Sequence, residues 1–207
     1  MPEVVVFVHG LYMTGLEFGL LRRRVVGAGF ATQRYQYHSL LRSVDENALL
    51  LADFLKGIET ERLHLVGHSL GGMVILRMFE RSVELPPGRV VFMGAPVRGS
   101  RAAVNLQERG LGFLLGRSGP EGLTLPHEAA WKASRELGVI AGTHAFSINP
   151  FQPNIPPPHD GVVSVEETRI SGAKDSIELP LAHTTMLFSN RLAEQVIIFL
   201  QRGDFSR

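Results

Sequence analysis

Short runs of hydrophobic residues alternate along the chain with segments whose hydrophobic residues recur every three or four positions. A continuous apolar run occupies residues 4–8, and short, mostly apolar runs occupy residues 63–66 and 89–93. Runs of this length predict strands that are buried on both faces of a parallel sheet. Residues 139–148 and 177–179 predict two further strands. Because strands and helices alternate from end to end, we expect an α/β protein with a mostly parallel central sheet and helices on both faces.

Three segments have hydrophobic residues at the spacing of an α-helix. Residues 43–46 read Ser-Val-Asp-Glu, which is a capping box, and the apolar stripe that follows contains Val44, Ala48, Leu51, Leu55 and Ile58. Residues 70–82 are apolar on most of the helix circumference and predict a buried helix. Near the end of the chain one face holds Leu192, Val196, Phe199 and Leu200. This pattern predicts a last helix that packs on the sheet.

Two segments interrupt the alternation. Residues 100–137 mix glycines with leucines too densely for one regular helix, and we interpret them either as a small cap over a site or as an irregular helical crossover. Residues 150–160 contain five prolines and end at Asp160. Proline restricts the backbone, so a stiff loop is expected to hold the Asp160 carboxylate in place.

Composition narrows the class of protein. The 207 residues favour a single domain over residues 1–207. The absence of Cys excludes a thiol nucleophile and disulfides. A net charge of +1 with scattered basic residues gives no reason to expect a nucleic-acid partner. No apolar run approaches the ~20 residues of a spanning helix, and residues 1–8 lack the features of a signal peptide, so we expect a cytoplasmic protein without membrane insertion.

The strongest chemical signal is the Gly-x-Ser-x-Gly motif formed by Gly67, Ser69 and Gly71. It lies directly after a predicted strand and directly before a predicted helix. A serine on such a turn is held in a strained conformation, and the small flanking residues let neighbouring backbone pass close by. The motif therefore predicts that Ser69 is a nucleophile, with the helix N-terminus beneath it favouring an oxyanion.

A serine nucleophile needs a histidine base and an acid that orients it. Of the eight His, His183 fits best, because it follows the last predicted strand and has small and hydroxyl neighbours. His68 and His9 lie inside motifs whose backbone is used. Asp160 is the favoured acid, since Gly161 permits a tight turn that aims the carboxylate inward.

Other acids remain as contenders for that role. Asp175 lies in a polar turn beside Lys174, and turn formation explains it better. Glu166 and Glu167 also fall between the serine and the histidine, and either one is a candidate for a supporting acid.

These residues resemble the α/β-hydrolases of the serine esterase and lipase type, in which the chain order is nucleophile, acid, histidine. The resemblance covers essentially the whole chain, and it is greatest to small bacterial lipases and esterases. It implies that the backbone N–H groups of Leu11 and Leu70 form the oxyanion hole, that Ser69, Asp160 and His183 are the catalytic triad, and that no metal or organic cofactor is required. The nucleophile is Ser rather than Asp, which excludes the dehalogenase and epoxide hydrolase branch.

The expected function is hydrolysis of carboxylic esters, with a small-molecule acyl ester of short to medium chain as the first choice of substrate and a longer lipid ester as the second. Tyr12 and Met13 beside the oxyanion loop, and Leu111, Phe113, Leu114 and Leu115 in the segment 100–137, suggest an apolar pocket. The leucines fit equally well a position in which they face the sheet and never contact substrate. The alternatives are a thioesterase, amidase or acyltransferase that uses the same triad, a non-catalytic relative that binds a ligand, and a lipase whose residues 101–116 open toward a membrane surface.

Overall fold

The centre of the molecule is a parallel β-sheet. A computed structural model describes residues 2–81, 83–124, 129–145 and 154–207. Six strands lie in the order β2-β1-β3-β4-β5-β6, and each neighbouring pair is parallel. The strands are β1 (Val4–Val8), β2 (Ala31–Tyr35), β3 (Leu63–His68), β4 (Val90–Met93), β5 (Leu137–Gly142) and β6 (Asp175–Leu179). The predicted α/β class with a mostly parallel sheet is confirmed.

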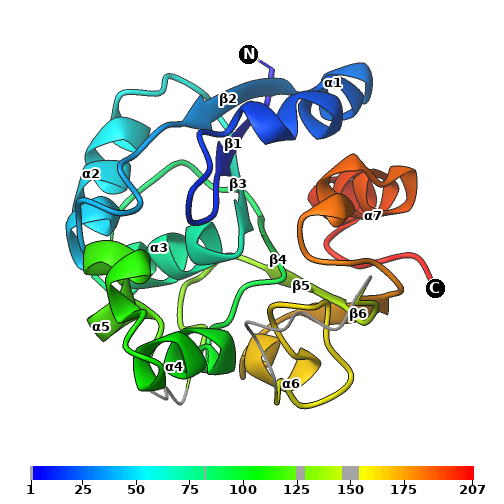
Figure 1. Ribbon diagram of the computed structural model, residues 1–207. Coiled ribbons are helices and arrows are strands. Elements are labelled where there is room, and N and C mark those ends of the chain that lie inside the picture. The colour runs from blue at the N-terminus through cyan, green and yellow to red at the C-terminus, as the bar shows by residue number, and fades with distance from the viewer. Residues whose placement is uncertain (1, 82, 125–128, 146–153) are drawn as a thin grey trace.

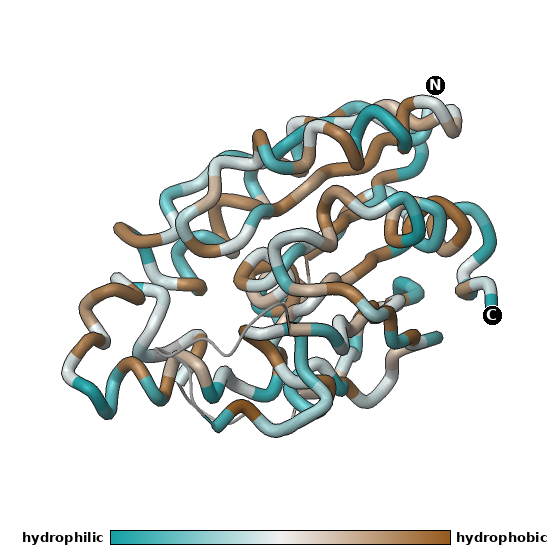
Figure 2. Tube along the Cα trace, turned by 45° about the vertical axis from the view of Figure 1, so that its right-hand side comes forward, coloured by the Kyte–Doolittle hydropathy of each residue, from teal (hydrophilic) through white to brown (hydrophobic). Residues whose placement is uncertain are grey.

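Helices cover both faces of this sheet (Figure 1). On one face α2 (Val44–Lys56) packs against α3 (Leu70–Phe79), and on the other α1 (Gly19–Gly27) packs against α7 (Asn190–Arg202). The apolar run of β1 is continuous because both faces of the strand are buried. Val4, Val6 and Val8 belong to one hydrophobic core, and Val5 and Phe7 belong to the other. In Figure 2 the hydrophobic stretches of the chain run through the centre of the molecule.

The remaining elements are short. The structure has the α-helices α4 (Arg101–Glu108), α5 (Gly119–Gly122) and α6 (Val165–Thr168), and the 3-10 helices η1 (Leu16–Phe18), η2 (Gly112–Ser118) and η3 (Thr185–Phe188). The predicted capping box is present, since the Ser43 side chain accepts from the backbone of Glu46 and the Glu46 side chain accepts from that of Ser43.

The strand order places a site at one end of the sheet. After β1 the chain builds β2 on one side and then β3 on the other side of β1. Ligands of open α/β sheets bind at the carboxyl ends of the strands where the order reverses in this way. The loop after β1 begins with His9 and Gly10, and the residue after β3 is Ser69. The loop that follows β1 and the Gly-x-Ser-x-Gly turn therefore meet at this point.

The boundaries of two predicted elements are wrong. The helix predicted over residues 70–82 ends at Phe79, and Ser82 lies outside the described residues. The strand predicted within residues 139–148 spans Leu137–Gly142, so it begins two residues earlier, and residues 146–148 are not among those described. Its edge partner β6 ends at Leu179, directly before Pro180, so no partner strand continues beyond Gly142.

The pattern of hydrophobic residues missed β2 and α1. The edge strand β2 has the sequence Ala-Thr-Gln-Arg-Tyr and is only partly buried, so it lacks the continuous apolar run of the central strands. The helix α1 contains three consecutive arginines, and its buried residues are Leu21 and Val25. Two buried positions in nine residues give too weak a period to predict a helix.

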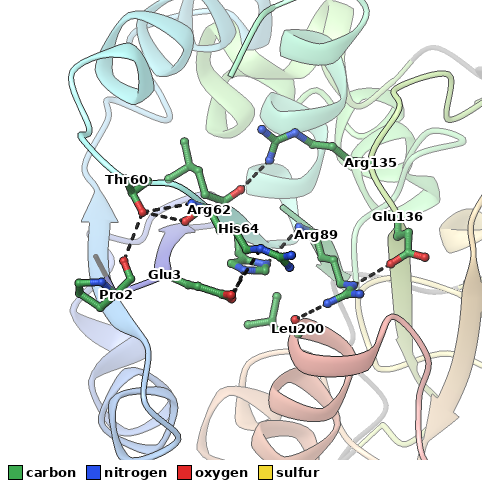
Figure 3. A network of polar contacts seen from close by, with 10 residues as sticks. Pro2, Glu3, Thr60, Arg62, His64, Arg89, Arg135, Glu136 and Leu200 are labelled. Carbon is green, nitrogen blue, oxygen red and sulfur yellow. Dashed lines mark hydrogen bonds and ion pairs between the residues drawn. The ribbon is translucent and has the colours of Figure 1, made fainter. Parts of the chain in front are cut away.

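Side chains tie together the opposite, amino-terminal end of the strands (Figure 3). His64 is fully buried, and its Nε2 lies 2.9 Å from Glu3 Oε2 while its Nδ1 accepts from the Arg89 N–H at 3.0 Å. Arg89 Nε lies 2.7 Å from Glu136 Oε2. Burial lowers the pKa of His64. These contacts link the starts of β1, β3, β4 and β5.

Candidate active site

Ser69 lies on a sharp turn between β3 and α3. Its φ of 53° and ψ of −123° are unusual for a residue with a side chain, and such conformations cost about 1–3 kcal/mol. The Ser69 N–H donates to the Met93 carbonyl at 3.0 Å, which anchors the turn to β4. A Cβ at Gly71 would lie 2.1 Å from the Val8 oxygen. Only glycine fits there, as the motif predicts.

Asp160 is held by its own backbone turn. The residue is 2% exposed, and its Oδ1 accepts from the N–H groups of Val162 at 2.9 Å and Val163 at 2.7 Å. Gly161 has a φ of 97°, so the predicted turn uses a conformation that favours glycine. Both N–H groups donate to Oδ1, which leaves Oδ2 free to face His183.

His183 is bound to Asp160 twice. Its Nδ1 lies 2.7 Å from Asp160 Oδ2, and its backbone N–H donates to the Asp160 carbonyl at 3.0 Å. A carboxylate accepts only, so we assign the hydrogen to Nδ1. The Nε2 atom of the neutral ring then has a free lone pair, which is the form a general base requires.

Gly94, which follows β4, makes room for this pair. Its φ is +54°, and a Cβ would lie 3.0 Å from Asp160 Oδ2 and 3.2 Å from His183 Nδ1. The close approach to the Asp160–His183 hydrogen bond is visible only once the loops after β4, β5 and β6 are placed together.

The loop after β1 reaches the serine. A Cβ at Gly10 would lie 3.2 Å from Ser69 Cβ. His9 shapes this loop, because its Nδ1 lies 2.9 Å from the Gly10 carbonyl and its ring stacks on Tyr37 at 4.2 Å between centroids. Burial lowers the pKa of His9. Within the described part of the chain the N–H groups of Leu11 and Leu70 have no hydrogen-bond acceptor, which is what free oxyanion donors require.

One cavity of about 210 Å³ brings the predicted residues together. Ser69, His183, Leu11 and Leu70 line it, and so do the predicted substrate-binding residues Tyr12 and Met13. The rest of the lining is mostly apolar and includes Pro96, Ala102, Ala103, Leu106, Leu115, Leu123, Val162 and Val163. The hollow beside Ser69 therefore suits a small apolar group.

The segment 100–137 supplies one wall of this cavity through α4, η2 and the residue after α5. Of the four leucine and phenylalanine positions expected to form the pocket, only Leu115 lines it. Phe113 is 74% exposed and Leu114 is 40% exposed, so these two face solvent.

The 3-10 helix η2 is attached to the loop before α2. Ser118 Oγ donates to the carbonyls of Ser39 at 2.7 Å and Arg42 at 3.0 Å, and the Arg117 N–H donates to the Leu40 carbonyl at 2.9 Å. The Tyr12 hydroxyl donates to the Leu114 carbonyl. These contacts connect the cavity wall to the body of the molecule and to the loop after β1.

The other predicted acids lie in unrelated contacts. Glu166 pairs with Arg98 and Arg169, and Glu167 forms a capping box at the start of α6. Asp175 begins β6, where its side chain accepts from the Phe205 N–H at 2.9 Å. Asp175 therefore belongs to a strand rather than to the predicted polar turn, and the neighbouring Lys174 Nζ lies 3.6 Å from Glu136 Oε1.

A second, larger cavity of about 880 Å³ lies along β6 and α6. None of the predicted site residues lines it. Among the described residues no group of three His, Asp or Glu side chains is placed to hold a metal ion, and no helix in the described ranges has the length and apolar content to cross a bilayer.

Comparison with known families places the chain in one of them. A sequence model of the alpha/beta hydrolase family matches residues 5–184, which is most of the chain. The protein therefore belongs to the alpha/beta hydrolase family. A search of curated proteins finds no match.

Several solved structures share the fold. The mature lipase BlEst2 of Bacillus licheniformis is 18% identical, with a TM-score of 0.76 over 97% of this chain and 91% of that one. The carboxylesterase CesB of Bacillus subtilis is 12% identical, with a TM-score of 0.64 over 98% and 84% of the two chains. A thioesterase of the prodiginine pathway of Streptomyces coelicolor, RedJ, is 14% identical, with a TM-score of 0.61 over 96% and 84%. At these identities the likeness concerns the fold.

Proposed function

We propose that this protein hydrolyses small carboxylic esters through an acyl-enzyme on Ser69. The observation that carries the proposal is the cavity in which the strained Ser69 and the Asp160-bound His183 lie together. Its small volume and apolar wall favour acyl chains of short to medium length, because pockets for drug-sized ligands are typically ~300 Å³ or more. Residence in the cytoplasm stays a prediction from the sequence.

The geometry supports a two-step acyl transfer. His183 Nε2 takes the proton of Ser69 Oγ as that oxygen attacks the ester carbonyl, and Asp160 stabilises the imidazolium that forms. The N–H groups of Leu11 and Leu70 donate to the oxyanion, each worth roughly 3 kcal/mol of barrier. The tetrahedral intermediate expels the alcohol, which takes its proton from His183. Water then releases the acid by the same route, with its proton passing to His183.

The test is hydrolysis of p-nitrophenyl esters from acetate to palmitate by the purified protein and by Ser69→Ala. Ser189→Ala is a matched control, because Ser189 also lies directly before a helix but is the cap of α7. We expect turnover in the native protein and in the control, and none in Ser69→Ala. Mass spectrometry of the native protein should locate a covalently bound fluorophosphonate probe on Ser69.

Three outcomes would contradict the proposal. Equal turnover in Ser69→Ala would show that Ser69 is not the nucleophile. Turnover of acyl thioesters or amides without any of esters would replace the substrate class while keeping the triad. A folded protein that neither turns over substrate nor reacts with the probe would favour a ligand-binding relative.

A further inference from the structure

His68, the last residue of β3, contacts the backbone of His183. The ring is fully buried, and its Nε2 lies 3.0 Å from the His183 carbonyl oxygen. A carbonyl oxygen only accepts, so Nε2 carries the hydrogen and donates it. The two rings lie close to each other, with centroids 4.7 Å apart and planes tilted by 42°.

The other ring nitrogen of His68 indicates why a histidine, rather than an apolar residue, occupies this position. Nδ1 is buried and has no hydrogen-bond partner among the described residues, and a buried polar atom left unpaired is unfavourable. An apolar side chain would avoid that cost. The bond from Nε2 to His183 is what a histidine supplies at this position and an apolar residue does not.

This bond joins the histidine to the strand that carries the serine. The other two hydrogen bonds of His183, from its backbone N–H and from Nδ1, both go to Asp160. They fix His183 relative to Asp160 but not relative to Ser69. His68 directly precedes Ser69, so its bond to the His183 carbonyl sets the position of the imidazole relative to the nucleophile.

We propose that His68 is a positioning residue, which holds the His183 backbone so that the ring reaches Ser69 and Asp160 together. The inference rests on the proposed function of those three residues. Burial, aided by the neighbouring His183 ring, lowers the pKa of His68 to about 3. The ring is therefore neutral at neutral pH and does not oppose the positive charge that His183 acquires during the reaction.

The test compares substitutions that keep or remove the donor. His68→Gln places an amide N–H near the position of Nε2, whereas His68→Leu has no donor and His68→Asn is too short to reach the carbonyl. We expect kcat for p-nitrophenyl acetate to fall roughly 10- to 100-fold in the Leu and Asn variants, as for other small misplacements of catalytic groups. KM should stay within about twofold, since a misplaced base affects the chemical step more than binding. The Gln variant should recover most of the loss.

His64→Leu is the matched control, because His64 is a fully buried histidine of the same strand at the other end of the sheet. It should lower thermal stability and leave kcat unchanged.

Nuclear magnetic resonance tests the proposal without turnover. The downfield proton shared by His183 Nδ1 and Asp160 should be observed in the native protein and in His68→Gln, and should shift or broaden in His68→Leu and His68→Asn. An unchanged resonance, an unchanged kcat, or equal losses in the Gln and Leu variants would overturn the role of His68. A native protein that fails with both esters and the fluorophosphonate probe would overturn the proposed function instead, and the proton resonance would still decide the role of His68.

Discussion

Replacing Gly94 by alanine tests whether the Asp160–His183 pair is as closely confined as the structure indicates. The new Cβ would lie 3.0 Å from Asp160 Oδ2 and 3.2 Å from His183 Nδ1. Both atoms belong to the 2.7 Å hydrogen bond between these residues. A methyl group at this distance has to displace the carboxylate or the ring by a few tenths of an ångström.

Two costs add up in this variant. The φ of +54° is a left-handed conformation, which is unfavourable for alanine by roughly 1–2 kcal/mol. The displacement then weakens the alignment of His183 as the proposed base, and a misplacement of about 1 Å can lower a rate roughly 100-fold. We expect Gly94→Ala to lose about 1–2 kcal/mol in its free energy of unfolding, and its kcat on a short ester to fall roughly 10- to 100-fold.

Gly29→Ala separates the two costs. Gly29 also has a positive φ, +99°, but a Cβ there meets nothing within 4 Å, and the residue lies between α1 and β2. Denaturant unfolding should show a loss of stability in both variants, whereas steady-state kinetics should show a loss of kcat in Gly94→Ala alone. If Gly94→Ala keeps kcat within twofold of Gly29→Ala, the close contact of Gly94 with the pair does not matter for the reaction.

Three further predictions concern other parts of the site. Asp160→Asn should lower kcat by about 10⁴-fold, because an amide favours the wrong tautomer of His183, and a loss under tenfold in the same ester assay would exclude Asp160 as the orienting acid. Leu115→Ala should enlarge the cavity and raise kcat/KM for longer acyl esters about fourfold per additional buried CH₂, at ~0.8 kcal/mol each; an unchanged chain-length profile would place the acyl group elsewhere. Burial lowers the pKa of His68 from 6.5 to about 3, so between these pH values the unfolded state binds one more proton than the folded state. The free energy of unfolding should therefore fall by about 1.4 kcal/mol for each pH unit as the pH decreases from 6.5 toward 3. Urea unfolding across pH should show this slope reduced by one proton in His68→Gln, and equal slopes in the two proteins would contradict the buried neutral ring.

The sequence predicted the central strands and the turn at Ser69 because these features are local. A continuous apolar run such as residues 4–8 has one simple explanation, which is burial on both faces of a sheet. The glycines around Ser69 are required by contacts within a few residues or with an adjacent strand, such as the approach of Gly71 to the Val8 oxygen. Patterns of this kind can be recognised in a single sequence without knowledge of the rest of the fold.

The missed features depend on distant parts of the chain. The edge strand β2 is defined by its pairing with β1 rather than by its own composition. The end of β5 at Gly142 is set by the end of its partner β6. Gly94 and His68 acquire their contacts with His183 only when loops from different strands meet. His68 lies inside the Gly-x-Ser-x-Gly motif, whose pattern depends on the backbone, so the sequence gives no sign of the contact that its side chain makes with His183.

The three proposed catalytic residues are positioned mainly by backbone contacts. Ser69 is anchored through its N–H to Met93, Asp160 through the N–H groups of Val162 and Val163, and His183 through its own N–H and carbonyl. Backbone bonds are preserved when neighbouring side chains change, so substitutions in the apolar core should alter stability far more than kcat. The exceptions are positions where a side chain takes part in this backbone network or where an added atom enters it. His68 is a position of the first kind and Gly94 of the second, and each therefore links the fold to the reaction.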